Sequence, residues 1–584
     1  METVSAPVAG VIVSLKVAEG ETVRTGQELA VLESMKIQTA LTAPAAGVLA
    51  SWQVAAGETV QKGRALCRLD MQAEALTVQQ DHTGDADNPA LEALRERAAK
   101  ASDAQRRDAI AKRHERGFRS ARENLDDLCD SGSFVEYGAF AVAAQRQHRD
   151  LEDLQRNTSG DGILTGLARV NGGKTVVAVN DYSVLAGTQG YFHHKKLDRA
   201  LTLARDENLP VVMYTEGGGG RPGDTDVLVQ FAGLNVPSFA QWAALKGKVP
   251  RIAVNNGYCF AGNAALFGAA DIRIATESSC IGMAGPAMIE GGGLGQFSPK
   301  QIGPIEVQRR NGVVDIVARD EAEATALAKQ ALSFFQGRNA QWQAADQSSI
   351  GEHLPRDRRF AYDVRKVIDQ LCDSDSVLEL KPAFGAAVVS ALVRIEGQPC
   401  GLLASNCKHL GGAIDAEAAD KCADFIDLCS QFELPIVSLV DTPGFMVGPD
   451  SESEAAVWRM SRLFASGAQS QSTWIAIFLR RAYGLGAMAL TGGSFARPLY
   501  AAAWPTGEFG AMGLEGAVKL GFKKQLEAVE DTAERQALFD QLLAQAYDKG
   551  RAIEAASYLE IDAVIEPGET RGLIARLVSE NTYS

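Results

Sequence analysis

Hydrophobic and polar positions alternate along the first seventy residues, and the pattern occurs twice. The run Ala6-Pro7-Val8-Ala9-Gly10-Val11 returns as Ala43-Pro44-Ala45-Ala46-Gly47-Val48, and Gly20-Glu21-Thr22-Val23 returns as Gly57-Glu58-Thr59-Val60, each 37 positions later. Alternating Val, Ile and Leu separated by Gly turns is typical of short β-strands. Two such units related by a pseudo-two-fold axis predict a small flattened β-barrel.

A lysine lies between the two copies, in Glu33-Ser34-Met35-Lys36-Ile37. Its place between the repeats predicts that Lys36 occupies the hairpin that joins them. A lysine at an exposed tip, held by a rigid repeat on both sides, is suited to modification by an enzyme. The alternative interpretation is an ordinary solvated lysine.

Residues 1–70 resemble the biotinyl carrier domain, because Met35 stands beside Lys36 in Glu-Ser-Met-Lys, where the related lipoyl domains usually carry Asp-Lys-Ala. The resemblance implies that a biotin protein ligase attaches biotin to Lys36, with Met35 as part of the acceptor sequence. Residues 71–88 turn polar and acidic and predict a flexible linker. The carrier is therefore expected to move as a body.

After Asn88-Pro89, a typical helix start, a charged helical segment is expected to about Asp130, and strands then alternate with helices. This plan occurs twice: Pro210-Val211-Val212 matches Pro435-Ile436-Val437, 225 positions later, and a second strand motif matches at a separation of 223. The duplication predicts two α/β domains, residues 89–345 and 346–584.

Each predicted domain has a strand that runs into a Gly-rich turn and then a helix. The two turns are Phe260–Ala264 and Gly484–Met488. Such turns aim free backbone N–H groups at one point, where they can stabilise an oxygen that becomes negative in a transition state. The alternative is that these glycines only permit close packing of helix on strand.

The span from about Asp87 to Ser584 resembles the carboxyltransferase component of biotin-dependent acyl-CoA carboxylases, a pair of crotonase-like (ββα spiral) domains. The motifs that carry the resemblance are Arg122–Phe134, Gly217-Gly218-Gly219-Gly220-Arg221, Phe260-Ala261-Gly262-Asn263-Ala264, Val440–Phe445, Arg481-Ala482-Tyr483-Gly484 and Ala503–Glu508. The implied activity moves a carboxyl group from carboxybiotin on the carrier to the α-carbon of an acyl-CoA.

The resemblance also implies roles for individual residues. The amides of Gly262 and Asn263 would hold the thioester oxygen, and those of Leu485, Gly486 and Ala487 the ureido oxygen of biotin. Tyr483 and Gly484 would lie at the biotin, and Gly218, Gly219, Gly220, Arg221 and Ala261 at the substrate. Two positions depart from the family pattern: Asn263 stands where Gly is usual and adds a side chain to the pocket, and Leu485 interrupts the usual Tyr-Gly-Gly-Ala.

Composition narrows the possible partners. The 584 residues carry a net charge of −15, which argues against nucleic acid, and no apolar run approaches the length of a membrane span. Without a visible signal peptide, and with nine scattered cysteines, the chain is expected in a reducing cytoplasm. No His, Cys or Asp spacing predicts a metal site, and no ATP-binding loop is visible. A separate biotin carboxylase subunit would therefore use the ATP and Mg²⁺, and the resemblance implies a dimer-built homo-oligomer, up to a hexamer.

Three other functions stay open. A biotin-dependent acyl-CoA decarboxylase would run similar chemistry in reverse, and a crotonase-type hydratase or isomerase would need a carboxylate base such as Glu216 or Glu290. A carrier scaffold with an inactive core is the third.

For the basic run His193-His194-Lys195-Lys196 we expect a solvated face, with contact to CoA phosphates as the alternative. The sequence does not indicate which acyl group is carboxylated.

Overall fold

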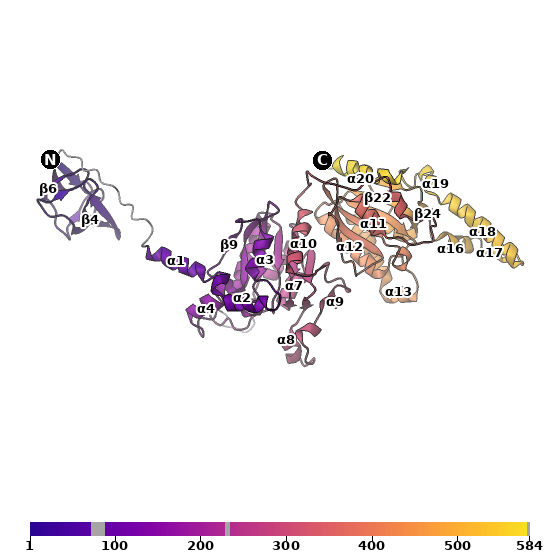
Figure 1. Cartoon of the computed structure of the whole chain (residues 1–584), viewed down its shortest axis with the longest axis horizontal. Helices are drawn as coiled ribbons and strands as arrows, with labels where there is room; N and C mark the ends of the chain where they lie inside the picture. Colours follow the sequence, from indigo (N-terminus) through magenta and orange to yellow (C-terminus); the bar gives the residue numbers. More distant parts are fainter. Residues whose placement is uncertain (72–87, 228–233, 581–584) are drawn as a thin grey trace. The chain divides into compact units, whose positions relative to one another are not determined.

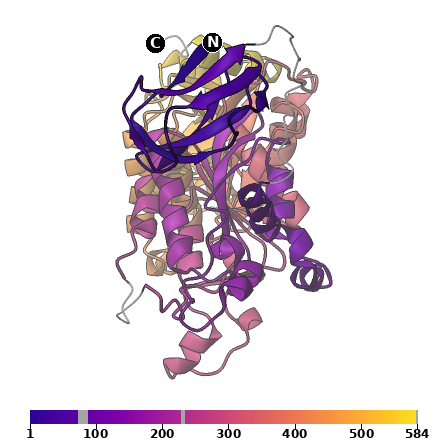
Figure 2. The ribbon, with the colours of Figure 1, turned by 90° about the vertical axis from the view of Figure 1, so that its left-hand side faces the viewer.

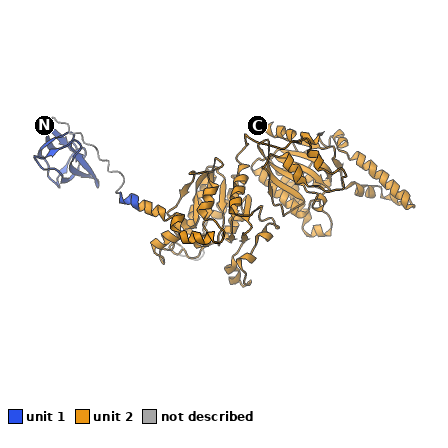
Figure 3. Cartoon of the chain, in the orientation of Figure 1, with its two compact units in different colours: residues 1–92 blue, residues 93–584 orange. Residues whose placement is uncertain are grey.

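The computed structural model describes residues 1–71, 88–227 and 234–580, and it divides the chain into two compact units, residues 1–92 and 93–584 (Figure 3). The predicted linker, residues 71–88, lies outside the described residues except at its two ends. The boundary predicted at residue 345 does not separate compact units, because both predicted α/β domains fall within the second one. Within the described residues, no helix is both long and apolar enough to cross a membrane.

The first unit is a barrel of two four-stranded sheets, ordered β1-β8-β6-β3 and β5-β4-β2-β7 (Figure 2, indigo strands). Exchanging β1 with β5, β2 with β6, β3 with β7 and β4 with β8 turns one order into the other. The strands are β1 (Glu2–Ser5), β2 (Gly10–Leu15), β3 (Thr22–Val23), β4 (Glu28–Ser34), β5 (Ile37–Thr42), β6 (Gly47–Trp52), β7 (Thr59–Val60) and β8 (Ala65–Met71).

The core of this unit repeats as the sequence does. Ile12 and Leu49 are both fully buried, as are Leu32 and Leu69, and each pair is 37 positions apart. One member of each pair belongs to each of the two clusters that fill the barrel. The predicted duplicated β-barrel is confirmed.

The second unit contains two large sheets built on one plan. The first is ordered β17-β15-β13-β12-β11-β10-β9 and the second β18-β19-β20-β21-β22-β23-β25, with β24 beside the end of β22. The strands of the first half are β9 (Val135–Tyr137), β10 (Ile163–Val170), β11 (Gly173–Asn180), β12 (Val211–Tyr214), β13 (Arg251–Asn255), β14 (Tyr258–Phe260), β15 (Ile272–Thr276), β16 (Cys280–Gly282) and β17 (Ile316–Ala318). Those of the second are β18 (Leu378–Leu380), β19 (Val388–Ile395), β20 (Gln398–Ser405), β21 (Ile436–Thr442), β22 (Trp474–Tyr483), β23 (Tyr500–Ala503), β24 (Glu508–Gly510) and β25 (Ala563–Val564).

Helices cover both faces of the first sheet, as successive side chains of β11 show. Val176 and Ala178 pack in one cluster with Leu197 of α5, while Val177 and Val179 pack in another with Leu125 of α3. This alternation is the period of a strand that is buried on both faces. The helices of the first half are α1 (Pro89–Ala99), α2 (Arg107–His114), α3 (Ala121–Leu128), α4 (Leu151–Asn157), α5 (Tyr191–Asp206), α6 (Ser238–Ala244), α7 (Gly262–Gly268), α8 (Pro286–Gly291), α9 (Ile305–Gln308) and α10 (Glu321–Ser333).

The second half packs against the first, because one hydrophobic cluster includes both Phe334 of the first half and Phe425 of the second. Beyond its sheet, α18 extends as an arm with only Leu542 buried (Figure 1). The helices of this half are α11 (Val364–Leu371), α12 (Ala416–Gln431), α13 (Pro449–Ser453), α14 (Ala456–Gln469), α15 (Gly484–Ala489), α16 (Leu514–Gly521), α17 (Lys523–Glu527), α18 (Thr532–Lys549), α19 (Ala552–Ser557) and α20 (Thr570–Glu580).

Candidate functional site

Lys36 lies at the tip of the hairpin between β4 and β5. Ser34 pairs with Ile37, so that Met35 and Lys36 alone form the turn, with φ of 46° and 67°. Two consecutive positive φ values define a type I′ turn, which matches the twist of the flanking strands. Lys36 is exposed and the side chain of Met35 is 91% exposed, so a ligase can reach the tip. The structure therefore fits covalent attachment of biotin here.

The first predicted donor loop joins β14 to α7. Ala261 takes φ 50° and donates its N–H to the carbonyl of Gly282, and α7 begins at the next residue. The first amides of a helix have no acceptor within the helix. The N–H groups of Gly262 and Asn263 are the first two amides of α7, so they have no acceptor within the helix.

The second loop repeats this geometry between β22 and α15. Gly484 takes φ 57° where Ala261 takes 50°. Phe260 pairs with Gly282 in the small parallel pair of the first half, and Tyr483 pairs with Gly510 in the second. Counting from these anchors, Leu485 and Gly486 correspond to Gly262 and Asn263, while Ala487 corresponds to Ala264.

Asn263 does not project into the pocket, contrary to the expectation from sequence. It is fully buried, and its Oδ1 accepts the N–H of Gly219 at 2.9 Å while its Nδ2 donates to the carbonyl of Thr215 at 3.2 Å. The side chain of Asn263 fits only because residue 217 is glycine, since a Cβ there would lie 2.3 Å from Nδ2 of Asn263. The side chain that departs from the family pattern therefore braces the glycine loop.

Arg221 also lies elsewhere than expected. Its guanidinium pairs with Asp161 and with Asp224, the latter at 2.7 Å, and its side chain is only 6% exposed. These two carboxylates in turn accept the N–H groups of Tyr191 and His193 at the start of α5. With two carboxylates as partners, Arg221 holds the glycine loop to α5 rather than offering a free charge to CoA.

The basic run 193–196 lies in the first turns of α5, which begins at Tyr191. The expected solvated face is wrong for two of its members, because His193 is fully buried and Lys196 is 6% exposed. Lys196 donates to the carbonyls of Gly160 and Ile163, and burial lowers its pKa to about 8. These contacts lie in the interior of the first half.

A charged cluster lies behind the first donor loop. Arg113 binds Glu216 at 2.8 Å and approaches Glu321 to 3.8 Å. Burial raises the pKa of Glu216, and burial together with the nearby Glu216 raises that of Glu321 to about 7. Glu216 is thus engaged by an arginine, and Glu290 is an exposed residue whose Oε1 accepts a hydrogen bond from Gln296, which gives neither carboxylate the setting of a base at the thioester.

The second loop is held by backbone packing and by a different charged cluster. A Cβ on Gly486 would lie 2.6 Å from the carbonyl carbon of Gly444, so the donor loop packs closely against the turn at Gly444 that follows β21. Just before that turn, the fully buried Asp441 accepts hydrogen bonds from Arg480 at 3.0 Å and Arg481 at 2.7 Å. One carboxylate here balances two arginines.

Tyr483 has partners that were not identified from sequence. Its hydroxyl donates to Glu508 at 2.9 Å, and Glu508 also pairs with Arg358 at 3.4 Å. Glu508 ends the Ala-Trp-Pro-Thr-Gly-Glu motif, and the pairing of β24 with β22 places it beside the loop. Arg358 lies far away in the sequence and in no motif, so no local signal could have found it.

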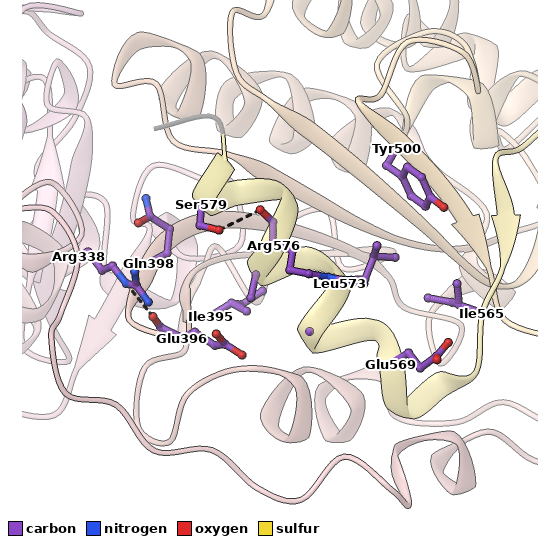
Figure 4. A pocket seen from close by; sticks show the side chains of 12 residues that line it. Arg338, Ile395, Glu396, Gln398, Tyr500, Ile565, Glu569, Leu573, Arg576 and Ser579 are labelled. Atoms are coloured by element: carbon purple, nitrogen blue, oxygen red, sulfur yellow. Dashed lines mark hydrogen bonds between the residues drawn. The ribbon is translucent and has the colours of Figure 1, made fainter. Parts of the chain in front are cut away.

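A cavity of about 950 Å³ lies against α20 (Figure 4). It is lined by Glu396, Tyr500, Leu573 and Arg576 among others, and none of the predicted site residues borders it. Among the residues that the structure describes, no cluster of His, Cys, Asp and Glu could hold a metal ion. The donor loops therefore remain the candidate site.

Comparison with known proteins identifies the family of each unit. The chain matches the family model for the carboxyl transferase domain over residues 112–581 and that for biotin-requiring enzymes over residues 2–69. A solved single-chain, multi-domain long-chain acyl-CoA carboxylase shares 51% identity and a TM-score of 0.81, and the match covers 99% of this chain and 56% of that one. This chain thus spans little more than half of that protein's length.

For two further relatives, the match covers most of this chain and most of the relative. The biotin-dependent long chain acyl-coenzyme A carboxylase beta4 subunit of Mycobacterium tuberculosis is 30% identical over 502 residues, 83% of this chain and 93% of that one. The solved structure of transcarboxylase 12S, described as a hexamer assembly with methylmalonyl-CoA bound, is 25% identical with a TM-score of 0.75 and covers 85% of this chain and 96% of that one.

Proposed function

Because this chain belongs to the carboxyl transferase family and carries a biotin-requiring domain, we propose that it moves a carboxyl group between the biotin on Lys36 and the α-carbon of a long-chain acyl-CoA. It is a carboxyltransferase with its own carrier, of the kind found in biotin-dependent acyl-CoA carboxylases. The observation that carries the proposal is the pair of donor loops, one in each half, with matching backbone geometry.

Each loop serves one of the two reactants in this proposal. The amides of Gly262 and Asn263 hold the thioester oxygen, which becomes negative when the α-proton leaves. The amides of Leu485 and Gly486 hold the ureido oxygen of biotin. Losing one such donor typically costs about 2.7–4 kcal/mol of transition-state stabilisation.

Attached to Lys36, biotin would supply the carboxyl group and the ureido nitrogen that takes the α-proton. The chain itself needs no side-chain base, which agrees with the arginine-bound state of Glu216. A hydratase or isomerase would need a free carboxylate base at the thioester, so the pairing of Glu216 with Arg113 supports carboxyl transfer over that alternative. The side chain of Asn263 is buried and does not block the backbone N–H of that residue. This supports an active core over an inactive scaffold.

A long acyl chain is supported by the segment that follows Gly282. Four of its apolar side chains are exposed: Met283, Met288, Leu294 and Phe297. They begin directly after the residue whose carbonyl binds Ala261 in the first loop. The relative at 51% identity is described as a long-chain acyl-CoA carboxylase.

The proposed activity requires two other proteins, one to attach biotin to Lys36 and one to carboxylate it. A biotin carboxylase that uses ATP and Mg²⁺ would load the biotin, and a biotin protein ligase would attach it. The hexamer described for transcarboxylase 12S supports a homo-oligomer. All nine cysteines are buried free thiols, which supports a reducing cytoplasm.

The test is a half-reaction that needs no partner. The chain, biotinylated at Lys36 as confirmed by intact mass, is mixed with carboxyacyl-CoAs from malonyl to long-chain, and release of the decarboxylated acyl-CoA is measured. We expect biotin-dependent release, fastest with long chains, and none from Lys36→Arg. No release from any member of the panel would overturn the proposal. Whether the cell uses the forward or the reverse direction is decided separately, by whether the chain copurifies with a biotin carboxylase or with a membrane subunit.

A further inference from the structure

One buried side chain faces the first donor loop and has no role so far. Gln189 is 3% exposed, and its backbone is fixed to the glycine loop, since its N–H donates to Gly219 and its carbonyl accepts from Arg221. Its Oε1 lies over Gly262, where a Cβ would be only 2.2 Å away. Gly262 must therefore be glycine for this amide to reach the loop.

The amide of Gln189 is incompletely bonded. Its Nε2 is buried and has no hydrogen-bond partner among the described residues. Leaving a buried donor unpaired costs free energy, and such groups are rare enough in folded proteins to need an explanation. A ligand that supplies the missing acceptor would be one.

The second half shows that the fold does not require an amide here. Ile414 occupies the equivalent place: its N–H donates to Gly444 at 3.0 Å and its carbonyl accepts from Met446 at 2.8 Å, as the backbone of Gln189 does in the first half. Ile414 is fully buried and apolar. The same backbone position thus carries a polar side chain only beside the loop assigned to the thioester.

We propose that the side-chain amide of Gln189 is a third donor to the thioester oxygen of the acyl-CoA, beside the amides of Gly262 and Asn263. The two ends of the amide have nearly the same shape, so a half-turn of the group brings Nε2 to the face of Gly262 now occupied by Oε1. There it would donate to the oxygen as negative charge develops. This inference rests on the proposed function, whose thioester site it extends.

The test compares two buried glutamines. Gln189→Met keeps the volume and removes the amide, and the matched control is Gln145→Met, whose amide donates to Asp224 and accepts from Arg149. In the half-reaction, followed as a single turnover of the biotin on Lys36, we expect Gln189→Met to lower the rate constant at saturating substrate (kcat below) about 10- to 100-fold. The half-saturating substrate concentration should change less than about threefold, and Tm should equal or exceed that of the parent. The control should lower Tm and leave kcat unchanged.

A second variant separates donation from packing. Gln189→Glu has the shape of glutamine but donates only when protonated, so its kcat relative to the parent should rise as the pH falls. A purely structural role would give no such rise.

The outcomes distinguish the two proposals. If the parent chain is active and Gln189→Met stays within about twofold of its kcat, or loses kcat together with Tm, the role of Gln189 is overturned and the carboxyltransferase function stands. If the biotinylated parent chain releases nothing, the proposed function itself fails, and with it this extension.

Discussion

The two donor loops share a positive φ at the same position and an equivalent strand pairing but are held by different contacts. In the first half, the side chain of Asn263 reaches under the glycine loop and bonds Gly219. In the second, Gly486 has no side chain, and its Cα packs directly against the backbone of Gly444. The comparison shows that one amide geometry can be fixed either by a buried polar bridge or by close backbone packing.

The charges behind the loops differ as well. Two carboxylates, Glu216 and Glu321, share Arg113 in the first half, whereas Asp441 alone binds Arg480 and Arg481 in the second. Burial, together with the neighbouring carboxylate of Glu216, raises the pKa of Glu321 to about 7. The charged cluster of the first half therefore contains one carboxyl group, that of Glu321, whose pKa is near neutral.

The largest expected effect comes from Gly486→Ala. The new methyl group would meet backbone atoms of Gly444 and Phe445 at 2.6–2.8 Å, which cannot move without shifting the loop. We expect transfer to fall at least about 100-fold, as for loss of a donor. Gly521→Ala, where a Cβ meets nothing within 4 Å, is the control and should keep full activity in the half-reaction.

Gly262→Ala tests whether the first loop is more tolerant. Its methyl group would meet Oε1 of Gln189 at 2.2 Å and the ring of Phe239 at 3.0 Å, both of them side-chain atoms that can move. We expect a loss of about tenfold, since displacement of side chains costs less than displacement of backbone. A loss larger than that of Gly486→Ala would contradict the difference drawn between the loops.

The charged clusters predict a pH dependence of stability. With its pKa raised from 4.5 to about 7, Glu321 binds a proton more readily in the folded chain, so its contribution to stability falls as the pH rises through this range. Between these limits the contribution of Glu321 to the free energy of unfolding falls by about 3 kcal/mol. Glu321→Gln should therefore increase the free energy of unfolding at pH 8 relative to the parent, and little at pH 4.5.

The measurement is denaturant unfolding of both proteins across that range. Glu323→Gln, on the same helix, is the control, because hydrogen bonds to Arg319 lower the pKa of Glu323 and give its contribution the opposite slope. An equal gain at both pH values for Glu321→Gln would show that the raised pKa is not the cause.

The smallest effect is expected from Tyr483→Phe. It removes the 2.9 Å hydrogen bond to Glu508, which keeps its ion pair with Arg358. Losing one such bond costs about 1 kcal/mol, or about fivefold in rate if the loop position depends on it. Single-turnover rates of the half-reaction measure this, and unchanged kinetics would leave Tyr483 with packing alone.

Sequence patterns predicted the features that repeat. The period of 37 predicted the barrel and the hairpin at Lys36, and the period of about 225 predicted two α/β halves with paired loops. Local pattern alone sufficed there, because each repeat carries its own strands and turns.

The partners of polar side chains could not be predicted in this way. Arg221 was expected at the substrate but bonds Asp161, sixty positions earlier, and Asn263 bonds Gly219 rather than facing the pocket. Such contacts join residues that only the folded sheet brings together, and the sequence offers several acceptors for each donor. The same holds for Lys196, whose acceptors are backbone carbonyls with no sequence signature.

Whether each loop receives one reactant can be seen in a cryo-electron microscopy structure of the biotinylated chain with a bound long-chain acyl-CoA. We expect the thioester oxygen about 3 Å from the amide nitrogens of Gly262 and Asn263, and the ureido oxygen about 3 Å from those of Leu485 and Gly486. A thioester at the second loop, or both reactants away from these amides, would contradict it.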